Sequence, residues 1–180
     1  GGNLSYSNTQ QNTYQGGANN AVGNASAFGR TLYLGRNWDL QGQPFQNPLT
    51  QGSEFLVGTS QSDNPRWSVQ NAGINTSVDR VIANVNLGYD LSEWLSVDYK
   101  AGINSYSQYG IDFIRPGSRG AGGLGRIIED YHNFEEIESN LLLTASPEIN
   151  EMFSLRAVAG FNINQRTMQR QLYQGAGYVA

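Results

Sequence analysis

The feature that most constrains the fold is an alternation of apolar and polar residues that begins near Val78 and has one lapse, at Ile82. The apolar positions of the first stretch are Val81, Ala83, Val85, Leu87 and Tyr89. Those of the second stretch, which follows a turn at 90–93, are Leu95, Val97, Tyr99, Ala101 and Ile103. Because successive side chains of a β-strand point to opposite faces, this pattern predicts an antiparallel hairpin over 78–106.

The pairing of the two strands follows from the same alternation. With Leu87 opposite Val97 and Asn84 opposite Lys100, the apolar residues other than Ile82 fall on one face and the polar residues on the other. The charged residues on the predicted polar strand faces are Arg80, Asp98, Lys100 and Arg156. Such charges fit a water-filled or plugged lumen, whereas Arg or Lys facing lipid at mid-bilayer costs about 2–4 kcal/mol.

The hairpin returns later in the chain in altered form. The stretch LSEWLSVDYKAGIN at 91–104 matches INEMFSLRAVAGFN at 149–162 at five identical positions. The repeat predicts a second hairpin over 134–164, with its turn at 147–151. We expect a long loop over 107–133 between the hairpins, the start of another loop at 165–180, and a strand-and-loop region of weak pattern over 1–77.

Strand length separates the possible architectures. Residues 153–163 span roughly 33 Å at about 3.3 Å per residue, and a tilt of about 40° reduces this to the roughly 25 Å of an outer-membrane apolar band. Strands of soluble sandwiches usually have only about 5–6 residues. Together with short turns at one end and long loops at the other, this length predicts an all-β fold, a segment of an antiparallel transmembrane β-barrel with short periplasmic turns and long extracellular loops.

Composition excludes several classes of function. The net charge of -4 provides no basic stripe for nucleic acid, and the absence of Cys excludes thiolate metal sites and Cys nucleophiles. The sequence contains no run of about 18 apolar residues, so no membrane-spanning helix is predicted. No signal peptide is recognisable. The sequence starts and stops within loop-like stretches, so we expect a piece of a longer protein.

Two local motifs resemble binding sites. GAGGLG at 120–125 has the G-x-G-x-x-G spacing, but Pro116 and Gly117 precede it and the flanking strands are antiparallel, so a surface loop is favoured over a nucleotide site. The second motif is an acidic cluster beside His132, formed by Glu129, Asp130, Glu135, Glu136 and Glu138. A solvated acidic loop is favoured over a cation site, no metal or other cofactor is predicted, and no enzyme activity is expected.

Aromatic residues lie beside both short turns. Tyr89, Trp94 and Phe153 are candidates for the aromatic girdle at the periplasmic membrane interface, and ordinary packing at strand ends is the alternative.

A family resemblance rests on two further stretches. NPRW at 64–67 and VDRVIANVNLGYDLSEWLSVDYKAGIN at 78–104 resemble the barrel region of SusC/RagA-type TonB-dependent outer-membrane transporters of Bacteroidetes. The matching positions are Asn64, Pro65, Trp67, Asp79, Arg80, Val81, Asn84, Val85, Leu87, Tyr89, Trp94, Leu95 and Val97. The resemblance covers roughly 60–165, and the chain has no recognisable TonB box, plug domain or full set of strands.

The resemblance implies a role in nutrient import across the bacterial outer membrane. Such transporters are barrels of 22 strands with an N-terminal plug, draw energy from TonB, and are covered by a SusD-like surface lipoprotein. Their cargo is oligosaccharide or oligopeptide, and lipid and lipopolysaccharide surround the wall. The candidate cargo-binding residues are Tyr106, Tyr109, Phe113, Arg115, Arg119 and Tyr131. The rival hypothesis is a structural or adhesive protein, either a small self-contained outer-membrane barrel or a secreted β-sandwich.

Overall fold

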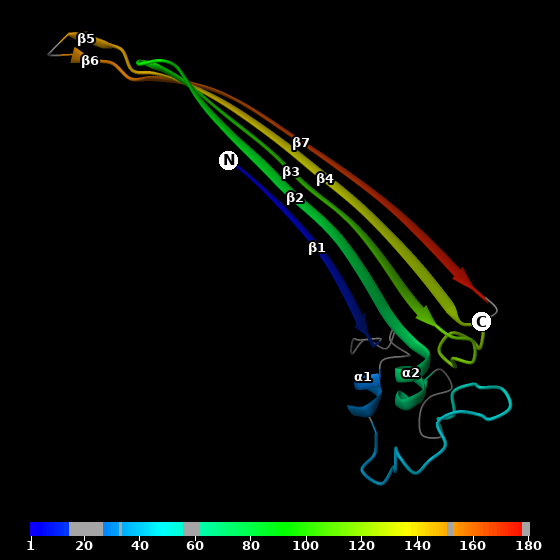
Figure 1. Ribbon diagram of the computed structural model, residues 1–180. Helices are drawn as coiled ribbons and strands as arrows, with labels where there is room; N and C mark the ends of the chain where they lie inside the picture. The colour runs from blue at the N-terminus through cyan, green and yellow to red at the C-terminus, as the bar shows by residue number, and fades with distance from the viewer. Residues whose placement is uncertain (15–26, 33, 56–61, 151–152, 178–180) are drawn as a thin grey trace. The chain divides into compact units, whose positions relative to one another are not determined.

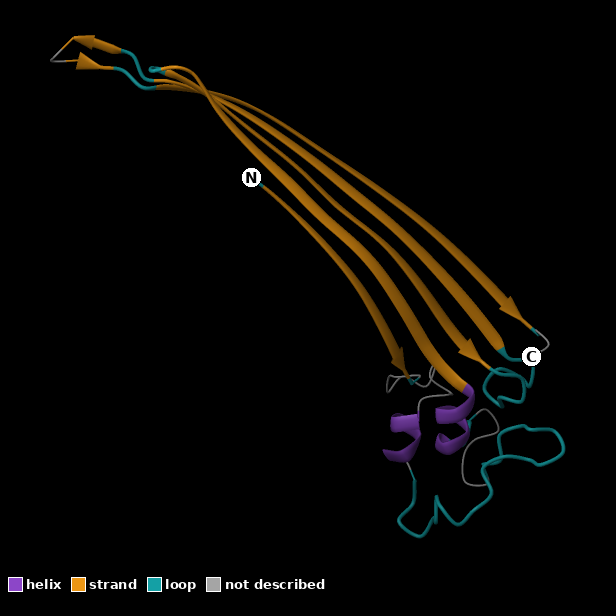
Figure 2. Cartoon of the chain, viewed as in Figure 1, coloured by secondary structure: helices purple, strands orange, loops and turns teal. Residues whose placement is uncertain are grey.

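The computed structural model describes residues 1–14, 27–32, 34–55, 62–150 and 153–177. Its long strands are β1 (Gly2–Thr13), β2 (Ala72–Ser92), β3 (Leu95–Ile114), β4 (Arg126–Ala145) and β7 (Ala157–Ala176). Two short helices, α1 (Ala27–Leu32) and α2 (Pro65–Asn71), precede β2, and the short strands β5 (Glu148–Asn150) and β6 (Phe153–Ser154) separate β4 from β7. Figure 2 shows the predominance of strand, so the prediction of an all-β fold is confirmed.

The five long strands form one open sheet in the order β1-β2-β3-β4-β7, which Figure 1 traces from blue to red. Cross-strand bonds run antiparallel: Gly1 and Asn86 exchange both main-chain hydrogen bonds, at 2.7 and 2.8 Å. Within the described residues the two outer strands, β1 and β7, are not paired with each other, so the sheet does not close on itself.

The pairing of β2 with β3 differs from the predicted one by two residues. A Cβ atom at Gly102 would stand 3.9 Å from the Cβ of Asn84, and the Arg115 amide donates to the Asn71 carbonyl at 2.8 Å. Asn84 therefore lies opposite Gly102 rather than Lys100. Because the side-chain period of a strand is two, this shift leaves every residue on its predicted face.

The predicted loops are shorter than expected. Residues 107–133 are strand up to Ile114 and again from Arg126, and the connection occupies only 115–125. Similarly, 165–176 continue β7, and residues 178–180 lie outside the described part of the chain. The predictions failed because 104–108 and 165–171 contain few apolar residues, so the alternation lapses there although the strands continue.

The turn predicted at 147–151 is also different. β5 and β6 form a separate two-stranded sheet there, with Glu148 opposite Ser154 and Asn150 opposite Phe153. Arg156, predicted on the polar face of a strand, lies between β6 and β7 and belongs to neither.

The chain divides into two compact units. Unit 1 comprises Gly1–Thr9, Val78–Gln108 and His132–Arg170, and unit 2 comprises Gln10–Ser77, Tyr109–Tyr131 and Gln171–Ala180. Unit 2 contains the small apolar core, in which Trp67, Ala72 and Ile114 pack with the half-buried Phe45 and Ala121. No helix in the described ranges is long and apolar enough to cross a membrane.

Candidate functional site: the two faces of the long strands

Odd-numbered residues of β2, β3, β4 and β7 lie on one face of the sheet. Within unit 1, the Ser139 hydroxyl donates to the Tyr99 hydroxyl at 3.2 Å on this odd face. The large apolar residues that unit 1 exposes on it are Val81, Val85, Leu87, Tyr89, Leu91, Tyr99, Ile137, Leu141, Leu143, Phe161 and Ile163. Each of them is at least 36% exposed, so these residues, hereafter the apolar face, have no covering layer in the described chain.

The even face of unit 1 is polar, and its side chains bond to one another. The Asn164 amide and the Arg166 guanidinium both donate to Glu136, at 3.0 and 2.7 Å. Between β2 and β3, Arg80 Nε donates to Asn104 Oδ1 at 3.0 Å. The exposed large apolar residues that interrupt this face are Ile82, Leu142, Val158 and Met168. The stacked rings of Tyr106 and Phe134 also lie on it. The face thus combines ionic and amide groups that are suited to contact with water or a polar solute.

Asp79 joins the edge strand β1 to the sheet. Its Oδ1 accepts hydrogen bonds from the Tyr6 hydroxyl at 2.7 Å and from Asn8 Nδ2 at 2.8 Å. Asp79 and Arg80 are adjacent in the sequence but lie on opposite faces of β2. The Asp-Arg pair of the resembling motif therefore acts through two separate contacts, one on each face.

The candidate interface aromatics are all exposed. Tyr89 is in β2, Trp94 is in the two-residue turn between β2 and β3, and Phe153 is in β6. The Trp94 carbonyl accepts a 2.7 Å hydrogen bond from the Ser146 amide, which ties the turn to the segment after β4. Their position beside the connections agrees with the predicted location at one end of the strands.

The six candidate cargo-binding residues do not form one site. Tyr106, Tyr109 and Phe113 are in β3 and Tyr131 is in β4, rather than in a loop. Tyr106 lies on the even face, where its ring stacks on that of Phe134 with centroids 5.1 Å apart. Sequence reasoning missed Phe134 because its partner precedes it by 28 positions on another strand.

Tyr109 and Tyr131 do meet, on the odd side of their strands in unit 2. Their ring centroids are 4.7 Å apart, and Tyr173 of β7 contacts Tyr131 edge-on at 6.1 Å. The Tyr109 hydroxyl donates to Glu129 at 3.1 Å. Burial and the neighbouring carboxylate raise the pKa of Tyr109 to about 12, so its hydroxyl remains a donor at neutral pH.

Arg115 and Arg119 have structural contacts in unit 2. Arg115 is exposed just after β3, whereas the Arg119 guanidinium donates to the Phe55 carbonyl. The Arg119 amide and the Ser118 hydroxyl donate to the buried Asp63, at 2.7 and 2.5 Å. This contact fixes the connection 115–125 against the segment before α2, so Arg119 acts first as an anchor of the loop.

The Asn-Pro-x-Trp motif has a structural explanation in unit 2. Asn64 caps α2 by accepting from the Arg66 amide at 3.0 Å, and Pro65 occupies the first turn, where its missing N–H costs nothing. The Trp67 ring is fully buried, and its Nε1 donates to the Gln51 carbonyl at 2.9 Å. Three motif residues thus start the helix and anchor it to the core.

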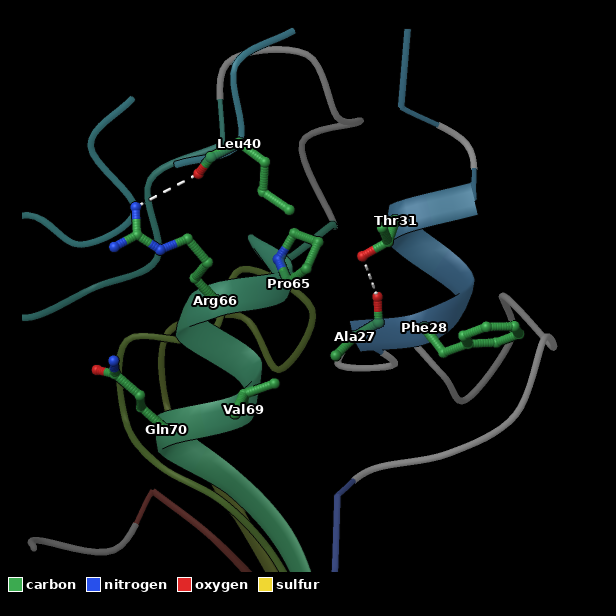
Figure 3. A pocket seen from close by; sticks show the side chains of 8 residues that line it. All are labelled: Ala27, Phe28, Thr31, Leu40, Pro65, Arg66, Val69 and Gln70. Carbon is green, nitrogen blue, oxygen red and sulfur yellow. Dashed lines mark hydrogen bonds between the residues drawn. The ribbon is translucent and has the colours of Figure 1, made fainter. Parts of the chain in front are cut away.

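A cleft between α1 and α2 is shown in Figure 3. Ala27, Phe28 and Thr31 line it from α1, and Pro65, Arg66, Val69 and Gln70 from α2, with Leu40 between. The Thr31 hydroxyl already donates to the Ala27 carbonyl, and Arg66 donates to the Leu40 and Gln41 carbonyls. With these polar groups occupied, the cleft is suited mainly to an apolar group.

The glycine motif lies in the connection between β3 and β4, and the acidic cluster lies in β4. Gly122, Gly123 and Gly125 have positive φ in the connection between β3 and β4, so no helix follows the motif as a dinucleotide site requires. The acidic residues predicted in a loop lie along β4, alternately on its two faces. Among the described residues no group of three or more His, Asp or Glu side chains is arranged to hold a metal ion.

Comparison with known proteins adds no assignment. No protein-family model matches the sequence, and no curated protein matches it. The two unlike faces of the strands are therefore the main functional feature of the described chain.

Proposed function

We propose that this chain forms part of the wall of an outer-membrane β-barrel that imports large nutrients. One observation supports this proposal most directly: strands of 20 or 21 residues expose an apolar face on one side and a bonded polar face on the other. A water-soluble monomer rarely leaves a contiguous apolar surface of this kind uncovered. In a barrel wall the same surface faces lipid.

The distribution of charge supports the same orientation. All five basic residues of β2, β3, β4 and β7 occupy even positions, namely Arg80, Lys100, Arg126, Arg166 and Arg170. A random placement would put some on the odd face, where each costs about 2–4 kcal/mol at the bilayer midplane. The odd face is therefore the lipid side, and the even face lines the lumen.

The more specific part of the proposal comes from the sequence resemblance. By that resemblance the barrel is a SusC/RagA-type transporter that takes up oligosaccharide or oligopeptide, with energy from TonB and a SusD-like lipoprotein as its surface partner. The even face, rich in Asn, Glu and Arg, offers hydrogen bonds to either cargo. The open edges of β1 and β7 would pair with further strands of the barrel, since unpaired edges are not tolerated in lipid.

Cysteine labelling of the full-length protein in its native membrane tests the orientation. The chain has no Cys, so single substitutions give defined sites once cysteines elsewhere in the protein are replaced. Val85→Cys and Leu141→Cys should resist a water-soluble maleimide and should be quenched by lipid-borne probes. Asn84→Cys and Asn140→Cys, their neighbours on the even face, should react when the lumen is open to water.

The outcome that contradicts the proposal is equally direct. Equal aqueous reactivity at both pairs, together with a protein that stays monomeric without detergent, would favour the soluble sandwich. If the orientation holds, uptake of fluorescein-labelled dextran fragments and casein peptides tests transport, which should stop when TonB is removed.

A further inference from the structure

A shallow groove lies on the odd face of unit 1, next to the apolar face. Its volume is about 270 Å³. The side chains that line it come from three neighbouring strands and are Ser105, Ser107, Asn133, Glu135, Thr167 and Gln169. Tyr106 and Phe134 also border it, but their side chains alternate to the even face, so they contribute main chain to its floor.

The polar side chains of the groove are not hydrogen-bonded to any other residue that the structure describes. Five of the six are exposed. The even face of the same strands differs, since Glu136, Asn164 and Arg166 bond to one another there. Together the groove offers hydroxyl and amide groups, each of which both donates and accepts hydrogen bonds.

The groove is continuous with the apolar face along two strands. Ile103 is the next odd-face residue before Ser105 in β3, and Ile137 is the next after Glu135 in β4. An occupant that contacts both surfaces must be amphiphilic, with a polar head in the groove and hydrocarbon along the apolar face. Thr167 and Gln169 follow the last aliphatic odd position of β7, Ile163, so the groove lies where the polar head of an amphiphile would end.

The charge of the groove indicates which polar head group of an amphiphile it can bind. The groove carries one carboxylate, Glu135, and no Arg or Lys occupies an odd position of β2, β3, β4 or β7. A phosphate head would meet a like charge without a cation to offset it. Neutral hydroxyl groups would instead pair with the amides, the hydroxyls and the carboxylate.

We propose that this groove binds the uncharged sugar of a membrane glycolipid, whose acyl chains lie along the apolar face. The inference rests on the proposed placement of the odd face in lipid and adds a specific ligand class to it. The site is separate from the import path, which the proposed function places on the even face.

Lipid titration of the full-length protein in mixed micelles tests the site, with native mass spectrometry as the readout. The probes are monogalactosyl diacylglycerol, the diacylglycerol with the same chains, and phosphatidylglycerol. We expect the galactolipid to bind about tenfold more tightly than either comparison lipid, the equivalent of one or two net hydrogen bonds. The Asn133→Leu/Gln169→Leu double variant should lose this preference.

Two further variants keep the test sharp. Thr167→Val preserves shape and should weaken galactolipid binding alone, whereas Asn86→Leu on the even face should leave it unchanged. Equal binding of phosphatidylglycerol, no effect of the double variant, or full competition by free galactose would each overturn the glycolipid site. If cysteine labelling places the odd face in lipid and this preference is absent, only the glycolipid inference fails; if labelling places it in water, the proposed function fails too.

Discussion

The two units of the chain differ in where they place their apolar side chains: unit 2 buries some of them, and unit 1 leaves them exposed. Every residue that is buried within the described chain belongs to unit 2, and no described residue of unit 1 is buried. Unit 2 packs Trp67 and Ile114 into a core and satisfies Asp63 with hydrogen bonds from neighbouring segments. Unit 1 instead sorts its residues onto two exposed faces.

This difference indicates where the stability of each unit comes from. Burial of apolar area is the main favourable term in folding, and unit 2 obtains it within its own residues. Unit 1 can bury apolar area only when other molecules cover its apolar face. Substitutions in unit 2 should therefore change stability in any solvent, whereas comparable substitutions in unit 1 should have small effects unless another surface covers the apolar face.

The largest expected effect is that of removing the buried ring in unit 2. Trp67→Ala empties a fully buried site and removes one of the two donors to the Gln51 carbonyl, and it should reduce the free energy of unfolding by about 3–5 kcal/mol. Denaturant unfolding of the full-length protein measures the loss. Trp94→Ala is the matched control, because that ring is 50% exposed. An equal decrease in the free energy of unfolding for the two variants would contradict the proposed difference between the units.

The next effect comes from the polar anchor in unit 2. Asp63→Ala leaves the Ser118 hydroxyl and the Arg119 amide without their acceptor, which costs roughly 1–3 kcal/mol. Limited proteolysis should then cut within 115–125. Ser139→Ala removes one exposed hydroxyl contact in unit 1 and should change neither measurement.

The same anchor predicts a pH dependence. Burial raises the pKa of Asp63 above its ordinary value of 3.8, even though hydrogen bonds from Ser118 and Arg119 act in the other direction. The folded protein then holds this proton more tightly than the unfolded chain does. The stability contribution is therefore fully present below pH 3.8 and is lost as the pH rises through the folded pKa. Asp63→Asn should remove this part of the profile, and an unchanged profile would contradict the assignment.

One substitution made in both units gives a smaller contrast. A Cβ atom at Gly73 in unit 2 would stand 3.3 Å from the Phe113 ring and from the Thr13 carbonyl oxygen, so Gly73→Ala should cost about 1 kcal/mol. At Gly102 in unit 1 the nearest atom is 3.6 Å away, and Gly102→Ala should be neutral or slightly stabilising. Thermal unfolding of the two variants checks the order, and the reverse order would contradict it.

The smallest expected effect is a change in ionisation without a change in fold. Burial is the main reason that the pKa of Tyr109 is about 12, and Glu129 contributes through its hydrogen bond and charge. Glu129→Gln should lower this pKa but leave it above the ordinary value of 10.0, as followed by tyrosinate absorbance. Glu135→Gln serves as the control for a carboxylate outside this contact, and a similar shift in that variant would show that Glu129 has no specific role.

Sequence reasoning succeeded where both faces of a strand differ in polarity. The alternation from Val81 to Ile103 predicted β2, β3 and the faces of their residues. It failed at 104–108, where residues such as Ser105, Ser107 and Gln108 interrupt the periodic signal before it returns at Tyr109, Ile111 and Phe113. The loop over 107–133 was predicted for that reason.

Contacts between distant residues were beyond the reach of local patterns. Asp63 meets Ser118 across 55 positions, and Tyr106 meets Phe134 across two strands. The groove is a similar case, since its six residues come from three strands and look unremarkable in sequence. Exposed Ser, Thr, Asn and Gln become a site only when the pairing of the strands places them side by side.

Strands with two unlike faces can change length only in even steps. One residue inserted into β3 next to Asn104 would turn the rest of the strand over and move Asp112 to the opposite face, unless a bulge absorbed it. Two inserted residues would preserve both faces, just as the two-residue difference in pairing at Asn84 does. Variants that lengthen these strands should therefore tolerate additions in pairs, and single additions should be tolerated only in the connections at either end.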